Sequence, residues 1–216
     1  MIAIVDYGAG NLSSVRKAFD HIGAEATIAG QSSIIDAADR IVLPGVGHFS
    51  ALSALNESGL RDSLLKSIAS GKPFLGICLG LQWLFDGSEE APDLAGAGLF
   101  PGRCRQFPAK VKSPHVGWNS LSLSGASESE HSKDRESGPG KSGHERSRLL
   151  CHLPSDPFVY FTHSFYAPVT HATSATTDSG LPFSAAVERA NIFGVQFHPE
   201  KSGAAGLLIL KAFCEV

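Results

Sequence analysis

The segment KPFLGICLGLQWLF, residues 72–85, joins a short apolar run to a cysteine and then to apolar residues at helical spacing. The apolar run predicts a buried strand, and the i, i+3, i+4 spacing that follows predicts a helix. Gly76 and Gly80 flank Cys78 at positions where a Cβ would crowd a sharp turn. The segment therefore predicts a strand, a tight turn and a helix, with the Cys78 thiol projecting from the turn as in a nucleophile elbow.

Cys78 is accordingly a candidate nucleophile. Free N–H groups at the start of the predicted helix favour negative charge, so they would stabilise a thiolate and later an oxyanion. The alternative interpretation is a buried structural cysteine, because free cysteine is among the most buried residue types. The choice depends on whether the chain also supplies a base.

The segment GVQFHPE, residues 194–200, supplies a candidate base. Its alternating apolar residues predict a strand that runs into His198. Pro199 fixes its own φ and holds His198 extended, so the imidazole and the Glu200 carboxylate stand close together at the strand end. His198 can then accept the thiol proton of Cys78 while Glu200 orients the imidazole. A solvated loop histidine is the alternative, but the two segments together favour a triad.

Short apolar strands alternate with helical segments through the first half of the chain. Strands are expected at 2–5, 24–28, 40–43 and 74–78, with helices after Asn11 and across 49–68. Short segments at 158–161, 172–176, 185–189 and 192–196 predict an antiparallel extension, and a last helix is expected at 204–215. The expected fold is α/β, an open, mostly parallel sheet with helices on both faces and an antiparallel extension, in a single domain over residues 1–216.

Residues 122–148 interrupt this pattern. They are rich in serine, glycine and balanced charges, with almost no large apolar side chains. Such a segment cannot bury enough surface to order itself. We therefore expect a mobile loop inserted within the domain, with a regulatory or docking arm as the alternative.

The composition is that of an ordinary enzyme subunit. The 216 residues carry a formal net charge of −3, so neither a nucleic-acid footprint nor a polybasic membrane surface is expected. We see no signal-type segment and no apolar run of bilayer length, which predicts a cytoplasmic protein. Cys78, Cys104, Cys151 and Cys214 lie far apart without metal-binding spacing, so no disulfide, metal or cofactor is expected.

The pairing of GICLGLQ (76–82) with FHPE (197–200) resembles the class I glutamine amidotransferases of the Cys–His–Glu triad type. Four further segments closely resemble the glutaminase subunits of imidazole glycerol phosphate synthases: IVDYGAGNL (4–12), LPGVG (43–47), PHVGWN (114–119) and GVQFHPEKS (194–202). The resemblance spans most of the chain. It implies hydrolysis of L-glutamine to glutamate and ammonia through a Cys78 thioester, in histidine biosynthesis, with Cys78, His198 and Glu200 as catalytic residues.

The resemblance also implies an oxyanion hole formed by the backbone amides of Val46 and Leu79. The glycines beside Val46 would let a peptide turn its N–H toward the thiol, although a plain turn after the preceding strand is the alternative. If the peptide before Val46 faces away in the resting enzyme, a flip induced by a partner would switch activity on.

The expected glutamine-binding residues are Gly45, Gly47, Gln82, His163, Ser164 and Phe165. Gln82 lies one helical turn past Cys78 and shares its face. Phe165 stands where the family leads us to expect tyrosine, so a hydroxyl contact is lost or comes from Tyr166. His163 competes as a catalytic base, but it lacks the adjacent carboxylate that His198 has.

A synthase partner is expected, because this chain has no second domain to use ammonia. The resemblance implies a heterodimer with a cyclase subunit, a (β/α)₈ barrel that makes imidazole glycerol phosphate and aminoimidazole carboxamide ribonucleotide. The expected interface residues are Asn11, Pro114, Val116, Trp118 and Lys201. For Trp118, composition alone favours a core position and only the resemblance favours the interface.

Two other functions remain possible from the sequence. One is a glutaminase subunit of another ammonia-using synthase, such as one for anthranilate or guanylate, against which the LPGVG and PHVGWN segments argue. The other is a non-enzymatic regulatory subunit that keeps the fold. The intact Cys78, His198 and Glu200 argue against that alternative.

Overall fold

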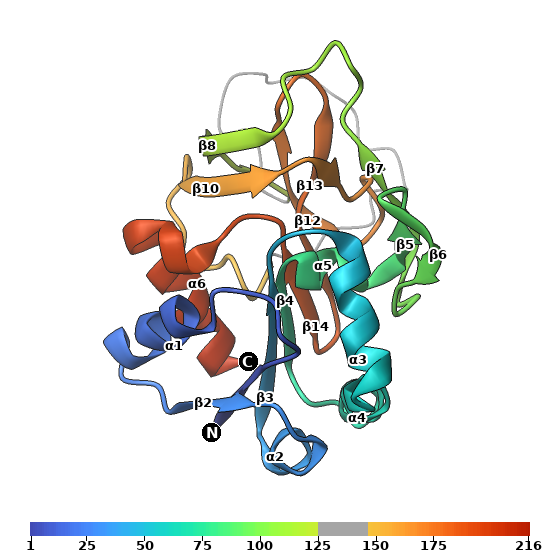
Figure 1. The fold of residues 1–216 in the computed structure, drawn as a ribbon. Helices are drawn as coiled ribbons and strands as arrows, with labels where there is room; N and C mark the ends of the chain where they lie inside the picture. Colours follow the sequence, from blue (N-terminus) through green and yellow to red (C-terminus); the bar gives the residue numbers. More distant parts are fainter. Residues whose placement is uncertain (125–146) are drawn as a thin grey trace, which may run out of the picture.

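An eight-stranded sheet forms the centre of the computed structural model, which describes residues 1–124 and 147–216 (Figure 1). Its strand order is β2-β1-β3-β4-β14-β13-β12-β9. In chain order these strands are β1 (Ile2–Val5), β2 (Ala26–Ala29), β3 (Arg40–Gly45), β4 (Phe74–Cys78), β9 (Ser122–Leu123), β12 (Thr173–Asp178), β13 (Pro182–Arg189) and β14 (Ile192–Val195). The five strands from β2 to β14 run parallel, while β13, β12 and β9 add antiparallel pairs. The predicted sheet is therefore confirmed.

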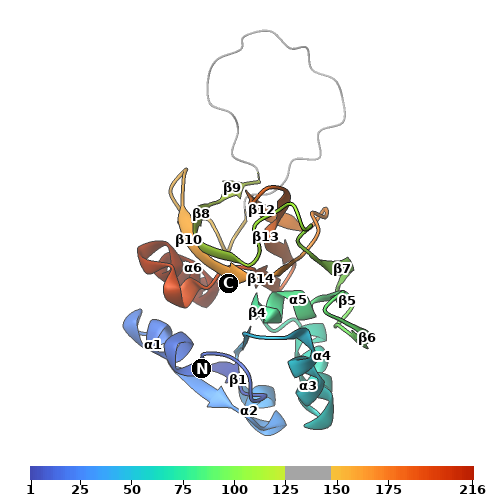
Figure 2. The same cartoon turned by 45° about the horizontal axis from the view of Figure 1, so that its top comes forward.

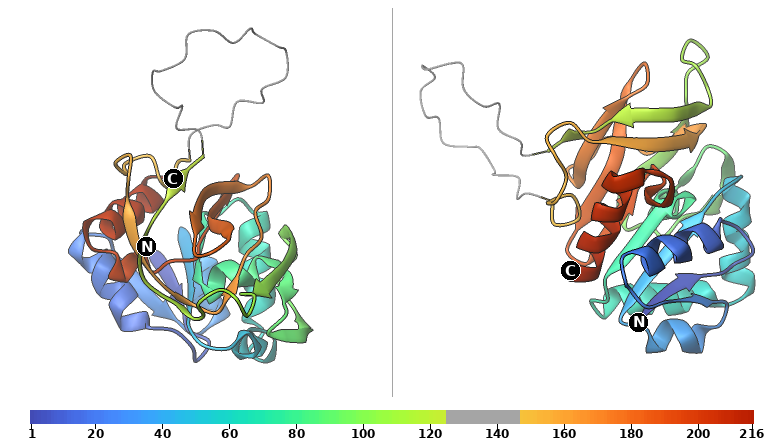
Figure 3. Two further views of the ribbon diagram at one scale, coloured as in Figure 1. Left: turned by 90° about the horizontal axis from the view of Figure 1, so that it is seen from above. Right: turned by 90° about the vertical axis from the view of Figure 1, so that its left-hand side faces the viewer.

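Helices cover both faces of the sheet (Figure 2). On one face lie α1 (Leu12–His21) and α6 (Gly203–Glu215), which pack side by side (Figure 3). The other face carries α2 (Ser32–Ala37), the 3-10 turn η1 (Phe49–Leu52), α3 (Ser53–Glu57) and α4 (Leu60–Ala69). Asn11 caps α1, because its side-chain oxygen accepts a hydrogen bond from the Ser14 amide at 3.3 Å. Two separate apolar cores, one under each helical layer, result from this arrangement.

The helix that follows Cys78 is shorter than the sequence predicts. The expected helix continues to Phe85, but α5 covers only Leu79–Trp83 and the chain enters strand β5 (Phe85–Ser88). Phe85 pairs in register with Phe100 of β7 (Phe100–Gln106), and their ring centroids lie 5.6 Å apart. Pairing with a distant strand overrides the local helical spacing here. With β6 (Ala91–Ala95) and β11 (Phe165–Tyr166), these strands form a four-stranded sheet that the sequence analysis missed.

A two-stranded ribbon stands apart from the main sheet, formed by β8 (His115–Ser120) and β10 (Phe158–His163) (Figure 1). We expected 158–161 to extend the main sheet, and this placement is wrong, because β10 pairs antiparallel with β8 instead. Side chains alternate between the two faces of such a ribbon. Val116, Trp118 and Phe158 are exposed on the outer face, whereas His115 and His163 are buried on the inner face.

The ends of the predicted loop at 122–148 are ordered, which corrects that prediction at both boundaries. Ser122 and Leu123 form β9, which pairs with β12. At the other end, the buried Ser147 hydroxyl donates a hydrogen bond to Glu188 at 2.7 Å. Main-chain pairing, the packing of Leu123 against the core and this buried contact hold the two ends in place. The rest of the predicted loop, residues 125–146, lies outside the described residues.

Candidate active site

Cys78 lies at the junction between β4 and α5, at the carboxyl end of the parallel strands. Its backbone adopts φ 54° and ψ −103°, a left-handed conformation that is strained for a residue with a side chain. A Cβ at Gly76 would lie 2.4 Å from the Gly80 carbonyl oxygen, and one at Gly80 would lie 1.9 Å from the Leu43 carbonyl oxygen. The two glycines are therefore required by the turn, and the expected strand–turn–helix geometry is present.

The second predicted segment meets Cys78 through the pairing of β14 with β4, in which Val195 lies opposite Ile77. His198 follows β14, and its Nδ1 lies 2.8 Å from Glu200 Oε1. The side chains of His198 and Glu200 are 1% and 2% exposed. Within the described residues, His198 Nε2 and Glu200 Oε2 are buried without a hydrogen-bond partner. The structure thus brings the three predicted catalytic residues into one buried cluster, with one imidazole nitrogen held and the other free to react.

The charge state of His198 follows from its surroundings. Burial lowers the pKa of His198, but the neighbouring Cys78 and the Glu200 carboxylate outweigh burial and raise this pKa to about 9. His198 is therefore protonated at neutral pH in the folded protein. The thiolate is the nucleophilic form of a cysteine, and a positively charged neighbour is the usual means of activating a catalytic cysteine.

This assignment predicts a pH-dependent difference in stability between the wild type and a His198→Asn variant. Because the pKa of His198 is raised from 6.5 to about 9, its stabilising contribution is complete below pH 6.5 and is lost as the pH rises through about 9. We expect the difference in the free energy of unfolding to narrow by on the order of 3 kcal/mol across this interval. Urea denaturation of both proteins at a series of pH values measures it. A difference that stays constant, or widens toward high pH, contradicts the assignment.

Gln196 contacts the sulfur of Cys78 directly, although the sequence analysis gave it no role. Its side chain is fully buried, and its Nε2 lies 3.7 Å from Cys78 Sγ. The Cys78 thiol also lies 3.9 Å from the Thr162 carbonyl oxygen. An amide side chain inside an otherwise apolar strand, two residues before His198, was the available signal for Gln196.

A cavity of about 270 Å³ opens in front of Cys78. It is lined by Gly47, Cys78, Leu79, Gln82, Glu90, Pro114, Thr162, His163, Ser164 and Phe165. Five of the six predicted glutamine-binding residues are in this set, together with Leu79. Glu90 was missed. Its Oε2 accepts a hydrogen bond from the Phe49 amide at 2.7 Å, which fixes the carboxylate at the cavity wall.

Gly45 and Val46 do not line the cavity. Gly45 pairs with Cys78 in the sheet, and a Cβ there would lie 2.3 Å from the Tyr7 hydroxyl oxygen and 2.8 Å from the Leu79 Cβ. Gly45 is thus packed behind Leu79 rather than facing the cavity. Val46 is 37% exposed. The Cβ direction of Gly45 therefore has no room for a ligand, and a substrate contact through the Gly45 backbone stays a prediction.

His163 is a poor catalytic base in this environment. Its Nδ1 lies 2.9 Å from the Phe165 carbonyl oxygen and its Nε2 lies 3.1 Å from His115 Nδ1, so both ring nitrogens are occupied. Burial lowers the pKa of His163 to about 3, which makes it a neutral imidazole. His198 has the free nitrogen and the carboxylate partner that a base requires.

The predicted interface residues Asn11, Pro114, Val116, Trp118 and Lys201 are all exposed. Trp118 is 56% exposed, so the alternative that places it in the core is wrong. Its ring packs edge-on against Tyr160 at 6.1 Å, and Lys201 Nζ lies 5.9 Å from the same Tyr160 ring. Trp118, Tyr160 and Lys201 therefore belong to one surface.

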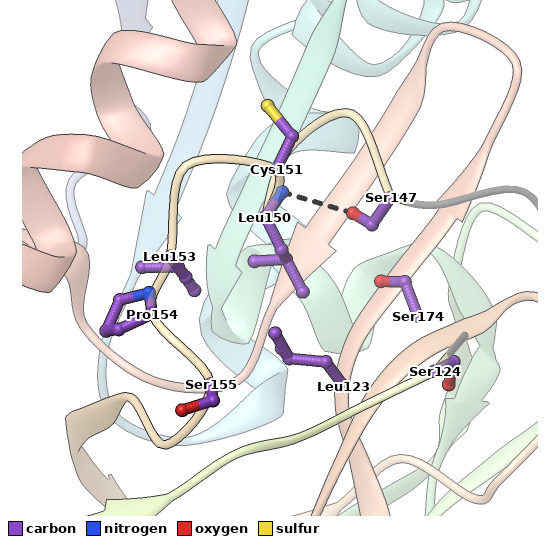
Figure 4. A pocket seen from close by; sticks show the side chains of 9 residues that line it. All are labelled: Leu123, Ser124, Ser147, Leu150, Cys151, Leu153, Pro154, Ser155 and Ser174. Atoms are coloured by element: carbon purple, nitrogen blue, oxygen red, sulfur yellow. Dashed lines mark hydrogen bonds between the residues drawn. The ribbon is translucent and has the colours of Figure 1, made fainter. Parts of the chain in front are cut away.

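A second hollow, of about 180 Å³, lies beside β9 and β12 and is shown in Figure 4. Its described lining residues are Leu123, Ser124, Ser147, Leu150, Cys151, Leu153, Pro154, Ser155 and Ser174. They include no histidine or carboxylate, and the Cys151 thiol points away from the other side chains in Figure 4. Without a base among its described lining residues, this hollow lacks the requirements for nucleophilic catalysis that the Cys78 cavity meets.

Comparison with known proteins identifies the family. The model of the family described as glutamine amidotransferase class-I matches residues 3–215. The chain belongs to this family. Solved amidotransferases share the fold at low sequence identity: a structure described as a glutamine amidotransferase superposes with a TM-score of 0.72 at 15% identity, covering 100% of this chain and 98% of its own. The PurLQS structure from Thermotoga maritima superposes with a TM-score of 0.71 at 16% identity, over 99% and 97% of the two chains.

Sequence relatives place the chain more narrowly among the amidotransferases. The imidazole glycerol phosphate synthase subunit HisH of Methanothermobacter thermautotrophicus is 46% identical, over 100% of this chain and 98% of the relative. The protein of the same name from Gloeobacter violaceus is 44% identical, over 99% and 88% of the two chains. The family predicted from the sequence segments is thereby confirmed, and this amidotransferase belongs with the HisH subunits.

The described residues contain no helix that is both long and apolar enough to cross a membrane. Within the same residues, 1–124 and 147–216, no three histidine, cysteine or carboxylate side chains gather as a metal site would require.

Proposed function

We propose that this chain is the glutaminase subunit of an imidazole glycerol phosphate synthase and acts in histidine biosynthesis. It hydrolyses L-glutamine at Cys78 and passes the ammonia to a cyclase subunit. The observation that carries the proposal is the buried cluster of Cys78, His198 and Glu200 at the edge of a polar cavity. The HisH relatives support the choice of this synthase. A catalytic thiolate requires a reducing compartment, so we place the reaction in the cytoplasm.

The first half of the reaction uses the thiolate and the imidazolium together. Cys78 Sγ attacks the carboxamide carbon of glutamine, and the backbone amide of Leu79, which lines the cavity, holds the tetrahedral oxyanion. In this proposal the Val46 amide becomes the second donor when the peptide before Val46 turns its N–H toward the thiol. The carbon–nitrogen bond then breaks as the protonated His198 gives its Nε2 proton to the departing amine, releasing ammonia. A glutamyl thioester on Cys78 and a neutral imidazole remain.

The second half restores the resting charges. Neutral His198 accepts a proton from water, and the resulting hydroxide attacks the thioester carbonyl. The carbon–sulfur bond breaks to leave the Cys78 thiolate beside a protonated His198, and the new γ-carboxyl group loses its proton to solvent to give glutamate. Glu200 keeps the imidazole in one orientation throughout, because its Oε1 lies 2.8 Å from His198 Nδ1.

Polar groups of the cavity fit the α-amino end of glutamine. Glu90 is the one carboxylate among the described lining residues, so we assign it to the α-ammonium group. Gln82 donates both hydrogens of its Nε2, to the Phe165 carbonyl at 3.0 Å and to Gln196 Oε1 at 3.4 Å. Its amide oxygen remains to accept a hydrogen bond from the substrate. Ser164, Gly47 and the backbone near Phe165 complete the proposed binding surface.

The outer face of the β8–β10 ribbon is the proposed docking surface for the cyclase subunit. Val116 and Trp118 are each 56% exposed and Phe158 is 55% exposed. An exposed aromatic and aliphatic group of this kind is typical of an interface core, and Asn11, Pro114 and Lys201 would lie toward its rim. The partner is a (β/α)₈ barrel in this proposal, and a closed interface keeps ammonia from being protonated in bulk water.

Transfer of labelled nitrogen tests the proposal. The purified chain and its cyclase subunit are incubated with the cyclase substrate, glutamine labelled at its amide nitrogen, and excess unlabelled ammonium. We expect the imidazole product to carry the label, because ammonia passes between the subunits without mixing with the solvent pool. Product whose nitrogen matches the solvent pool, or no product from glutamine, argues against this function.

A further inference from the structure

The inner face of the β8–β10 ribbon carries two buried histidine side chains that have no role in the reaction described above. His115 and His163 lie opposite each other in the strand register and are 9% and 7% exposed. They sit among aromatic rings, with the His115 ring stacked on Phe161 at 4.7 Å. Buried imidazoles in such a setting must satisfy their ring nitrogens within the protein.

In the pair formed by His115 and His163, each ring donates one hydrogen bond in the direction of the Phe165 carbonyl. The Phe165 carbonyl oxygen can only accept, so His163 Nδ1, at 2.9 Å, carries the hydrogen. Burial lowers the pKa of both His163 and His115, which keeps both rings neutral. His163 Nε2 is then a bare acceptor, and the donor across the 3.1 Å contact is His115 Nδ1.

Asn119 binds the far side of the histidine pair, at His115. Its Oδ1 accepts the Ser120 backbone N–H at 2.9 Å, which sets the orientation of the side-chain amide. Its Nδ2 therefore faces His115 Nε2, at 3.3 Å, and donates to it. The series of hydrogen bonds begins at a backbone N–H, which can only donate, and ends at a backbone carbonyl, which can only accept. Only one tautomer of each histidine therefore satisfies every hydrogen bond between them.

The series of hydrogen bonds continues from His163 to Cys78. The Phe165 carbonyl that receives His163 also receives Gln82 Nε2 at 3.0 Å, and Gln82 contacts Gln196 at 3.4 Å. Gln196 in turn lies 3.7 Å from Cys78 Sγ. A line of hydrogen bonds thus runs from Asn119, next to the exposed Trp118, to the sulfur of Cys78.

We propose that His115 is a positioning residue that couples the outer face of the ribbon to the glutamine site, by locking His163 and the Phe165 carbonyl in place. The inference rests on the proposed function, because it assigns the outer face to the cyclase subunit. A partner that shifts β8 displaces Asn119 and His115 with it, since the inner and outer residues alternate on one strand. The shift reaches the substrate cavity through His163 and Gln82, without any contact between the partner and Cys78.

A His115→Phe variant tests the coupling. Phenylalanine keeps the ring that stacks on Phe161 and removes both hydrogen bonds, so the aromatic packing is retained. We expect kcat/KM for glutamine in the complex with the cyclase to fall about tenfold, because one of the two lost hydrogen bonds is the buried one that holds His163. The dissociation constant for the cyclase should stay unchanged, because the outer face is intact. Nitrogen NMR of the imidazoles should report the Nδ1–H tautomer of His163 in the wild type and a mixture in the variant.

Two further variants make the result decisive. Asn119→Ala keeps the link between His115 and His163 but removes the hydrogen bond to His115, together with those to the Asp178 carbonyl and the Ser120 amide. It should lower kcat/KM in the same direction by a smaller factor, which covers the case in which His115→Phe fails to fold. Ser120→Ala, on the same strand but with its side chain outside the chain of bonds, should match the wild type. Full activity of a folded His115→Phe complex, or a loss confined to cyclase binding, overturns the coupling. Absence of glutaminase activity in the wild-type complex instead overturns the proposed function.

Discussion

Replacing Cys78 with alanine abolishes release of glutamate from glutamine. We expect a fall in kcat of about 10⁶-fold in the complex with the cyclase, the loss typical of removing a covalent nucleophile. The variant keeps the buried volume nearly unchanged, because only the sulfur is removed, so the fold and the complex should persist. Glutamate release at saturating glutamine, followed with a coupled assay, measures the effect.

Cys151→Ala is the matched control for this experiment. Cys151 is an exposed free cysteine on the hollow in Figure 4, which has no base among its described lining residues. The Cys151→Ala variant should retain wild-type glutaminase activity. Use of ammonia by the Cys78→Ala complex should also persist, because the cyclase reaction itself does not involve the thiol. Equal glutamate release by wild type and Cys78→Ala would contradict the catalytic assignment.

Replacing Glu200 with glutamine produces the second largest loss. The Glu200 carboxylate lies 2.8 Å from His198 Nδ1 and stabilises the positive charge of the imidazolium. The neutral side-chain amide introduced by the substitution does not stabilise that charge, and its NH₂ group can turn toward the imidazole. We expect kcat to fall by about 10³- to 10⁴-fold, comparable to amide replacement of the carboxylate in a serine protease triad. KM for glutamine should change little, since Glu200 is not among the residues that line the cavity.

The surface pair His152–Glu215 offers a close control for that substitution. Its nitrogen–oxygen distance is 2.7 Å, but its side chains are 42% and 49% exposed. Glu215→Gln removes the same kind of carboxylate from the same kind of histidine without touching the site, so activity should be unchanged. A Glu200→Gln enzyme that keeps most of its kcat would show that the carboxylate does not orient the base.

Local sequence predicted the elbow, because the strain at Cys78 requires glycines at fixed neighbouring positions and those glycines are visible in the chain. The His198–Pro199–Glu200 arrangement was equally local. The Cys78 turn and the His198–Glu200 segment lie close together because the parallel sheet places the carboxyl ends of neighbouring strands at one edge.

The missed features depend on contacts between distant segments. Phe85 pairs with Phe100, and this contact ends the helix earlier than the apolar spacing indicates. Glu90 reaches the cavity because Phe49 holds its carboxylate, and the histidine pair forms only when β8 meets β10. None of these partners is close enough in the sequence to leave a periodic signal.

The central claim, a glutamyl thioester on Cys78, is tested most directly by trapping with hydroxylamine. Hydroxylamine competes with water for a thioester and converts it to glutamyl hydroxamate. In the wild-type complex we predict that rising hydroxylamine diverts product from glutamate to hydroxamate, with one ammonia released for each molecule of either product. The Cys78→Ala complex should form neither product. If glutamate formation by the wild type is insensitive to hydroxylamine, or the hydroxamate also forms without the Cys78 thiol, the covalent mechanism is contradicted.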